Sequence, residues 1–122
     1  MSAVSPPRRA LLDGVNIVDL SSGLAGPFAT RLLAELGAEV VKVEPSGGDP
    51  ARVTAPAGFA SWNRSKQSVT LRLDDAVDRE HLESLLGAAD VLVHDFTPAK
   101  AKSYGLDDEA LRQRHPNSSC RP

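Results

Sequence analysis

Blocks of apolar residues with different spacings predict strands and helices in alternation. Residues 16–20, Asn-Ile-Val-Asp-Leu, form a short apolar run between glycine-containing turns, which predicts a buried strand. A helix should follow, with Pro27 in its first turn and Gly37 as a left-handed cap at its end. Residues 39–44 predict a second strand, so residues 16–44 should form a strand–helix–strand unit with parallel strands and a right-handed crossover. The helix carries an apolar stripe made of Phe28, Ala29, Leu32, Leu33 and Leu36.

The rest of the chain continues the alternation after one long interruption. Residues 45–63 are rich in Gly, Pro, Ala and Ser and show no period, which predicts a long loop. A third strand is predicted at 68–73, a helix at about 77–86 and a fourth strand at 89–94. Residues 107–114 should form a short helix, because acids stand in its first turn and bases in its last. The expected fold class is therefore α/β, with at least four mainly parallel strands.

Composition narrows the class of protein. With 122 residues the chain has the size of one ordinary domain, and 41% hydrophobic with 25% charged residues is typical of a soluble globular protein. The net charge is −2 with both signs interspersed, so there is no broad basic face and a nucleic-acid partner is not expected. No apolar run approaches the roughly 18 residues that a membrane span needs, so no membrane partner is expected either.

The two ends of the chain add little chemistry. Residues 1–10 lack the apolar stretch of a signal peptide and predict a flexible leader, which makes the cytoplasm the predicted location. Cys120 is the only cysteine, which excludes an internal disulfide and makes a metal site unexpected. It falls in residues 117–122, which we interpret as a frayed tail.

Three segments that follow predicted strands are the candidate ligand site. These are Ser21–Pro27, Glu44–Arg52 and Asp95–Pro98, which should meet at the carboxyl edge of the sheet, where open α/β folds bind ligands. The first leads into a helix N-terminus that suits a phosphate, although its glycines serve a plain tight turn equally well. Because Gly23 and Gly26 are spaced as Gly-x-x-Gly, the dinucleotide fingerprint fails and a nicotinamide-binding domain is disfavoured.

Several motifs taken together are more specific. Residues 12–27 followed by 33–45 closely resemble the opening of family III CoA-transferases of the CaiB/BaiF type, a group with formyl-CoA and carnitine CoA-transferases and the related α-methylacyl-CoA racemases. Blocks similar to the family's later ones follow in order, at 48–52, 62–69, 89–98 and 104–106. The resemblance implies that residues 11–116 are the N-terminal CoA-nucleotide-binding part of such a protein, a partial Rossmann-like domain.

The resemblance also implies a chemistry and a set of contacts. Family members move CoA between carboxylic acids through an aspartyl mixed anhydride, because a carboxylate can both attack a thioester and return the acyl group to CoA thiolate. The implied substrates are acyl-CoA and carboxylic acids, CoA is the carrier, no metal is needed, and the family forms interlocked homodimers. The CoA contacts carried over to this sequence are Gly23, Leu24, Ala25, Leu71, Arg72, Leu73, Asp74, Asp95, Phe96 and Thr97.

No residue of this sequence aligns with the family's catalytic aspartate, which lies downstream of the matched region. We therefore expect a CoA-transferase family III protein truncated before that aspartate. Two alternatives stay open: a catalytically inactive fragment that retains at most CoA binding, and a relative of the acyl-CoA racemases. A catalytic role for Asp95 is disfavoured, because the resemblance assigns that position to CoA contact and turn acids are common.

Departures from better-known members predict weaker CoA binding. Pro45 stands where some members carry a base, Gln67 replaces a base, and Ser103 falls where a CoA-contacting arginine is usual. Asp95 and Thr97 replace the commoner Asn and the commoner Gly or Arg. Fewer cations bind a phosphate-rich ligand less tightly unless other bases substitute. The candidate substitutes are Arg52, Arg64, Lys66, Lys100 and Lys102.

Two smaller features of the long loop have competing interpretations. Phe59 and Trp62 either close over an adenine or anchor the loop, and we favour the anchor because large aromatic rings usually bury area. Residues 63–66 present two bases before a strand, which fits a phosphate contact or a solvated turn.

Overall fold

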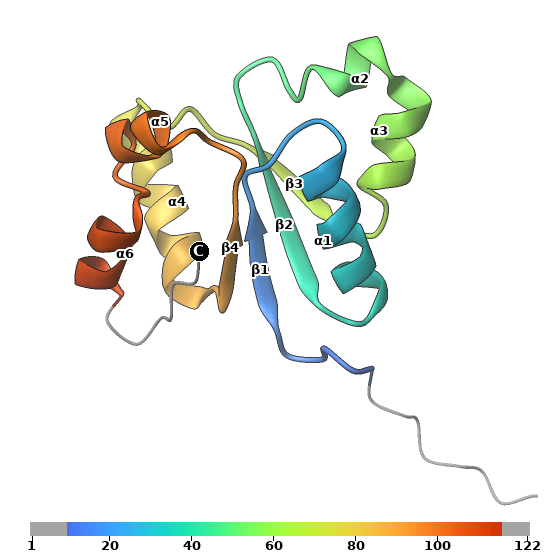
Figure 1. The fold of residues 1–122 in the computed structure, drawn as a ribbon, viewed down its shortest axis with the longest axis horizontal. Helices are drawn as coiled ribbons and strands as arrows, with labels where there is room; N and C mark the ends of the chain where they lie inside the picture. The colour runs from blue at the N-terminus through green and yellow to red at the C-terminus, as the bar shows by residue number, and fades with distance from the viewer. Residues whose placement is uncertain (1–9, 116–122) are drawn as a thin grey trace, which may run out of the picture.

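A computed structural model describes residues 10–115 and contains one parallel sheet. The predicted tail at 117–122 with Cys120, and the predicted leader except for Ala10, lie outside the described residues. The strands are β1 (Asn16–Asp19), β2 (Glu39–Glu44), β3 (Gln67–Thr70) and β4 (Val91–Val93), in the spatial order β3-β2-β1-β4. All three pairings are parallel, so the carboxyl ends of the strands meet at one edge (Figure 1). The predicted α/β fold with a mainly parallel sheet is confirmed.

Helices lie on both sides of this sheet. Figure 1 shows the first three helices gathered on one side and the last three on the other. Strand residues alternate between these sides, so Ile17 and Val40 pack towards one set of helices while Val18 and Val43 pack towards the other. The helices are α1 (Ala25–Glu35), α2 (Ala51–Thr54), α3 (Pro56–Trp62), α4 (Ala76–Ala88), α5 (Pro98–Ser103) and α6 (Asp108–Arg114).

The prediction of an unbroken loop at 45–63 was wrong, since α2 and α3 lie within it. Helices this short present too few positions to show a hydrophobic period. Helix α5 was missed for the same reason, although its start carries a recognisable signal. Thr97 Oγ1 accepts the backbone N–H of Lys100 at 3.2 Å, and Pro98 occupies the first turn.

The ends of the predicted elements also shifted. Strand β3 ends at Thr70 and β4 covers only Val91–Val93, so both are shorter than the apolar runs that predicted them. Gly37 has φ +108°, which confirms the left-handed end of α1. A Cβ at Gly37 would lie 2.5 Å from Ala10 Cβ, so this position needs glycine for space as well.

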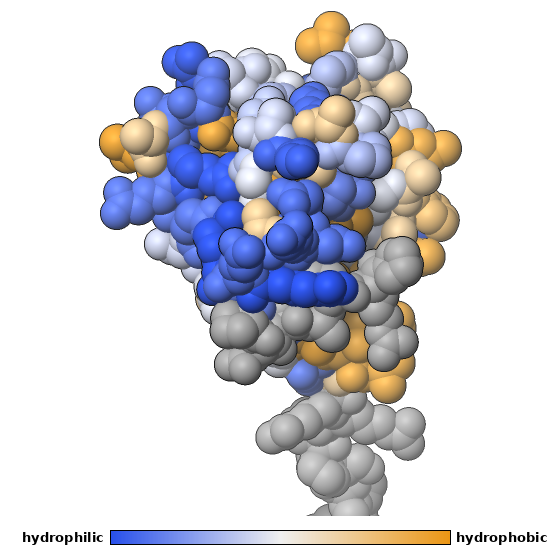
Figure 2. Space-filling model, turned by 60° about the vertical axis from the view of Figure 1, so that its left-hand side comes forward, coloured by the Kyte–Doolittle hydropathy of each residue, from blue (hydrophilic) through white to orange (hydrophobic). Residues whose placement is uncertain are grey.

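Most of the apolar stripe on α1 faces away from the sheet. Phe28, Leu32 and Leu36 are 41%, 42% and 44% exposed, whereas Pro27 and Thr30 are buried. Figure 2 brings the side with α4, α5 and α6 forward and shows it mostly hydrophilic, with hydrophobic residues mainly along one edge of the view. The sheet therefore covers only part of the apolar face of α1.

This orientation predicts opposite outcomes for two apolar substitutions. Ile17→Val removes one methyl group from a side chain that is 2% exposed, and should lower the free energy of unfolding by about 1 kcal/mol. Leu32→Gln alters a half-exposed helix position and should change it by less than about 0.5 kcal/mol. Urea denaturation of both variants checks this, and a larger loss for Leu32→Gln would show that the stripe is packed.

Within residues 10–115, no helix combines the length and the apolar composition needed to cross a bilayer.

Candidate nucleotide-binding pocket

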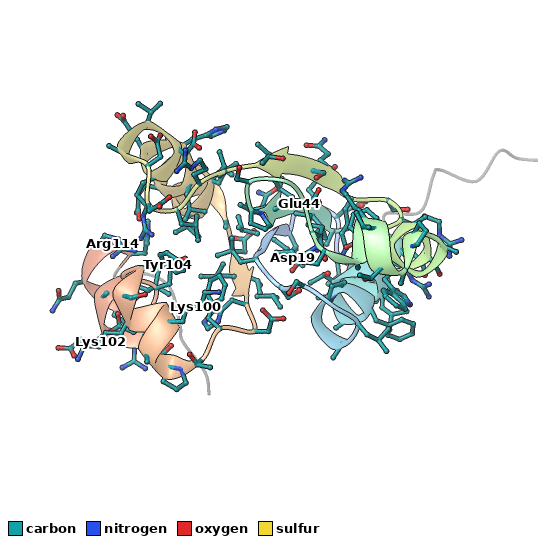
Figure 3. All side chains as sticks on the ribbon, turned by 90° about the horizontal axis from the view of Figure 1, so that it is seen from above. Asp19, Glu44, Lys100, Lys102, Tyr104 and Arg114 are labelled. Atoms are coloured by element: carbon teal, nitrogen blue, oxygen red, sulfur yellow. The ribbon has the colours of Figure 1, made fainter. Side chains whose placement is uncertain are left out.

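A cavity of about 470 Å³ opens at the carboxyl edge of the sheet. All three predicted ligand segments contribute to it, as does the segment that follows β3. Figure 3 looks down on this edge, with Asp19 and Glu44 at the ends of neighbouring strands and, across from them, Lys100 of α5 and Tyr104 just after this helix. The lining comprises residues 20–22, 42–46, 49–50 and 71–74, together with Phe96, Lys100 and Tyr104.

Half of the predicted CoA contacts line this cavity. Leu71, Arg72, Leu73 and Asp74 form one wall just beyond β3, and Phe96 contributes another after β4. Both segments follow strand ends, which explains why they meet although 22 or more positions separate them in the sequence.

The other predicted contacts lie beside the cavity. Gly23, Leu24 and Ala25 are exposed at the start of α1, outside the lining. Asp95 is also exposed, and its Oδ2 accepts the backbone N–H of Ser22 at 3.1 Å, which links the loops after β4 and β1. Thr97 caps α5, as described above. The roles of all ten residues in CoA binding stay predictions.

Most of the bases proposed as substitute cations are engaged elsewhere. Arg52 pairs with Glu44, Arg64 pairs with Glu35, and Lys66 is buried against Asp19. Lys102 is exposed and lies on the outer side of α5, away from the lining (Figure 3).

Lys100 is the substitute base that lines the cavity. Its Nζ lies 5.2 Å from the centre of the Phe96 ring, which itself stacks on His94 and contacts Tyr104. Arg72 adds a second cation to the wall, with a side chain that is 63% exposed and 3.9 Å from Asp74. The cavity thus combines aromatic surface with two accessible cations.

Beneath the pocket, buried charges replace apolar side chains on one face of the sheet. Asp19 is fully buried and accepts hydrogen bonds from the hydroxyls of Ser21 and Thr30, the latter at 2.7 Å. Lys66 Nζ pairs with Asp19 at 2.9 Å and also donates to the Pro27 carbonyl at 2.9 Å. The Lys66 side chain is 1% exposed, whereas Arg64 and Ser65 are exposed, so the turn at 63–66 is solvated at only one of its two bases.

Glycine in the first turn of α1 permits this arrangement. A Cβ at Gly26 would lie 2.3 Å from Ser21 Oγ, so any larger residue would displace the serine. The small residue therefore allows α1 to approach the end of β1 closely enough for Thr30 to reach Asp19.

A second buried group joins β2 to the loop that follows it. Glu44 receives two hydrogen bonds from Arg52, at 2.7 and 2.8 Å, and one from the Ser68 hydroxyl. Lys42 Nζ lies 3.1 Å from Asp49 Oδ2, and both side chains are at most 2% exposed. Buried charges are stable only when paired in this way.

These contacts control the protonation of the carboxylates. Burial disfavours the charged form of Asp19, but hydrogen bonds from Ser21, Thr30 and Lys66 and the Lys66 charge outweigh it and hold its pKa below the ordinary value. The hydrogen bond from Arg52 is the main reason that the pKa of Glu44 falls to about 2, with burial opposing it. Both groups are therefore carboxylates at neutral pH. Burial lowers the pKa of Lys66, and its contact with Asp19 only partly offsets this.

Sequence reasoning included Glu44 and Asp49 only as members of the candidate ligand segment Glu44–Arg52, and it did not include Lys42. A signal for them was present, because Lys42 and Glu44 interrupt an apolar strand at alternate positions and so must share one face. In a strand buried on both faces, such charges require partners.

The aromatic residues of the former loop support the anchor interpretation. The Phe59 ring lies 4.2 Å from the Arg52 guanidinium and 5.8 Å from Lys42 Nζ, and Trp62 packs against Gly58. Neither Phe59 nor Trp62 lines the cavity. In the described part of the chain, no group of three or more His, Cys, Asp or Glu side chains is placed to hold a metal ion.

Comparison with known proteins identifies the class. A family model described as CoA-transferase family III matches residues 12–117, which is most of the chain. The chain therefore belongs to CoA-transferase family III.

Its relatives include CoA-transferases whose names give different carboxylic acids. The chain is 39% identical over 117 residues to succinyl-CoA:mesaconate CoA-transferase of Haloarcula marismortui, and 38% identical over 114 residues to succinyl-CoA:glutarate CoA-transferase of Homo sapiens. Each alignment includes 87% of this chain, but only 30% and 26% of the respective relative. The chain thus spans less than a third of the length of these curated relatives.

Solved structures agree in fold. A hypothetical protein from Mycobacterium tuberculosis superposes with a TM-score of 0.82 at 39% identity, covering 88% of this chain and 31% of that one. A CaiB/BaiF family protein from Brucella suis gives a TM-score of 0.85 at 34% identity, covering 91% and 32%.

Proposed function

We propose that residues 11–116 hold the nucleotide end of coenzyme A for a family III CoA-transferase. The observation that carries the proposal is the cavity at the carboxyl edge of the sheet. It is lined by Leu71–Asp74 and Phe96, which the family resemblance independently assigns to CoA contact. A volume of about 470 Å³ lies in the usual range for small-molecule sites.

The lining matches the chemistry of the CoA nucleotide. Arg72 and Lys100 offer accessible cations for phosphate groups, and the Phe96 and Tyr104 rings offer apolar surface for an adenine. Among residues 10–115, Lys100 is the one substitute base that lines the cavity, which supports binding that is weaker than in better-known members.

For the covalent chemistry, we propose a nucleophile supplied by polypeptide outside this chain. The buried carboxylates Asp19, Glu44 and Asp49 are each committed to a lysine or an arginine, and Asp95 accepts a backbone N–H. An acyl-CoA and a carboxylic acid are the proposed substrates of the complete site, and the interlocked homodimer implied by the family resemblance is its proposed assembly.

Calorimetric titration of the purified chain with free CoA tests the nucleotide site. We expect saturable binding of CoA and none of NAD at the same concentrations, because the first loop lacks the dinucleotide fingerprint. Circular dichroism establishes that the titrated chain is folded. A folded chain that ignores CoA, or that binds NAD equally well, overturns the proposal.

Two lysines on the same helix give a matched pair of variants. Lys100→Ala should weaken CoA binding about tenfold, since a hydrogen bond to a charged group contributes about 1.5 kcal/mol or more. Lys102→Ala removes the same charge from α5 but lies outside the cavity, so it should leave the dissociation constant within about twofold. Equal effects from both variants would indicate long-range attraction rather than a contact.

A further inference from the structure

A buried lysine lies directly beneath the proposed CoA site. Lys42 occupies the middle of β2, its side chain is 1% exposed, and it borders the cavity. Burying an ammonium group costs several kcal/mol unless good partners compensate. An apolar side chain at this position of β2 would be buried at a lower free-energy cost. The contacts of the Lys42 ammonium group therefore call for a functional explanation.

The two partners of Lys42 belong to different loops. Its Nζ donates to the Ser21 carbonyl at 2.9 Å, in the loop after β1, and lies 3.1 Å from Asp49 Oδ2, in the loop after β2. Asp49 in turn accepts the Ala51 N–H at 2.9 Å and donates its own N–H to Glu44 at 2.8 Å. One ammonium group therefore joins the loops that follow two neighbouring strands.

Both loops form walls of the cavity. Ser21 and Ser22 line it from the β1 side, and residues 45–46 and 49–50 line it from the β2 side. A change in their separation would alter the shape of the cavity without touching its cations. The Lys42 ammonium group contacts both loops and thus controls their separation across the cavity.

We propose that the buried Lys42–Asp49 ion pair is a positioning device that holds the loops after β1 and β2 in the arrangement that accepts the CoA nucleotide. This inference rests on the proposed function for its ligand. Lys42 and Asp49 act through the backbone of the two loops, and both are positioning residues.

The neighbouring ion pair serves as an internal comparison. Asp19 and Lys66 are buried to the same degree, yet Lys66 lies outside the lining and donates to the Pro27 carbonyl and to Asn63 Oδ1 at 2.8 Å. Those contacts join the start of α1 to the turn before β3. Thr30, which donates to Asp19, is likewise buried and outside the cavity.

Hydrogen exchange tests the coupling without any ligand. Asp49→Asn removes the charge while keeping the shape, and should speed exchange at least about tenfold at the amides of Ser22, Gly48 and the substituted residue, in both loops together. Thr30→Val removes a buried hydrogen bond next to the cavity and is the control, with those amides unchanged. Faster exchange in the β2 loop alone would overturn the proposal.

Calorimetry of the same variants tests the consequence for CoA. Asp49→Asn and Lys42→Met should each weaken CoA binding about tenfold in the folded chain, and the double variant should be no weaker than Lys42→Met, because the two residues act as one unit. Thr30→Val should stay within about twofold of the unsubstituted chain. Wild-type affinity in folded Asp49→Asn, or an equal loss in Thr30→Val, would contradict the positioning role.

The two proposals fail in different ways. If the unsubstituted chain does not bind CoA, the proposed function is wrong, while hydrogen exchange still decides whether the pair couples the loops. If the unsubstituted chain binds CoA and the Lys42→Met variant is folded, the affinity of this variant for CoA tests the positioning role. If the Lys42→Met variant is unfolded, the affinity of the milder Asp49→Asn variant provides the same test.

Discussion

Replacing Lys66 with methionine is expected to lower the free energy of unfolding by about 3–5 kcal/mol. The substitution leaves the Asp19 carboxylate fully buried without its cation, and an uncompensated buried charge is among the most costly single changes in a protein. Methionine fills a similar volume, so the loss reports the charge rather than a cavity. Chemical denaturation followed by circular dichroism at neutral pH measures it.

Two further variants identify the source of that loss. Asp19→Asn combined with Lys66→Met removes both charges and should be less damaging than Lys66→Met alone, because no isolated ion remains. Lys102→Met removes an exposed lysine and should change stability by less than about 0.5 kcal/mol. If Lys66→Met costs under about 1 kcal/mol, Asp19 is not held as a buried carboxylate.

Acid is expected to destabilise the fold through Glu44. Its pKa is about 2 in the folded chain against an ordinary value of 4.5, mainly because of the hydrogen bond from Arg52. A carboxyl group with a lowered folded pKa stabilises the protein fully above its unfolded pKa, and this contribution disappears as the pH falls through the folded pKa. The loss should therefore begin near pH 4.5 and approach completion near pH 2.

The expected loss from Glu44 is about 2–3 kcal/mol, after allowing for solvent screening of the half-exposed Arg52. Asp19 acts in the same direction because its pKa is also lowered. Urea denaturation between about pH 5 and about pH 3 measures the slope.

Glu44→Gln is the control for the acid prediction. This variant should be less stable at neutral pH but should lose stability less steeply on acidification, because it has no carboxyl group to protonate. An unchanged slope in Glu44→Gln would assign the acid sensitivity to other carboxylates.

The order of the elements followed from local sequence because each long element carries its own period. The apolar runs around Ile17 and Val40, and the capped helix between them, were recognised from neighbouring residues alone. The short helices α2, α3 and α5 were not, since one or two turns give no period to detect. Ordered motifs also carried the family resemblance, which comparison with known proteins confirmed.

The candidate site was predictable only where it depended on strand ends. The carboxyl ends of parallel strands lie at the same edge of a sheet, which places Leu71–Asp74 and Phe96 at one edge. The position of Lys100 was not fixed by that rule, because it depends on a helix that the sequence pattern did not reveal.

The sequence by itself determined the α/β class, a mainly parallel sheet and the family, because short-range periods and ordered motifs carry that information. Only the tertiary structure decided which charges are paired. Asp19 meets Lys66 across 47 positions, and Lys42 reaches Ser21 across 21, which no local pattern encodes. The outward orientation of the stripe on α1 was likewise decided only by the tertiary structure, because burial of a helix face depends on what packs against it.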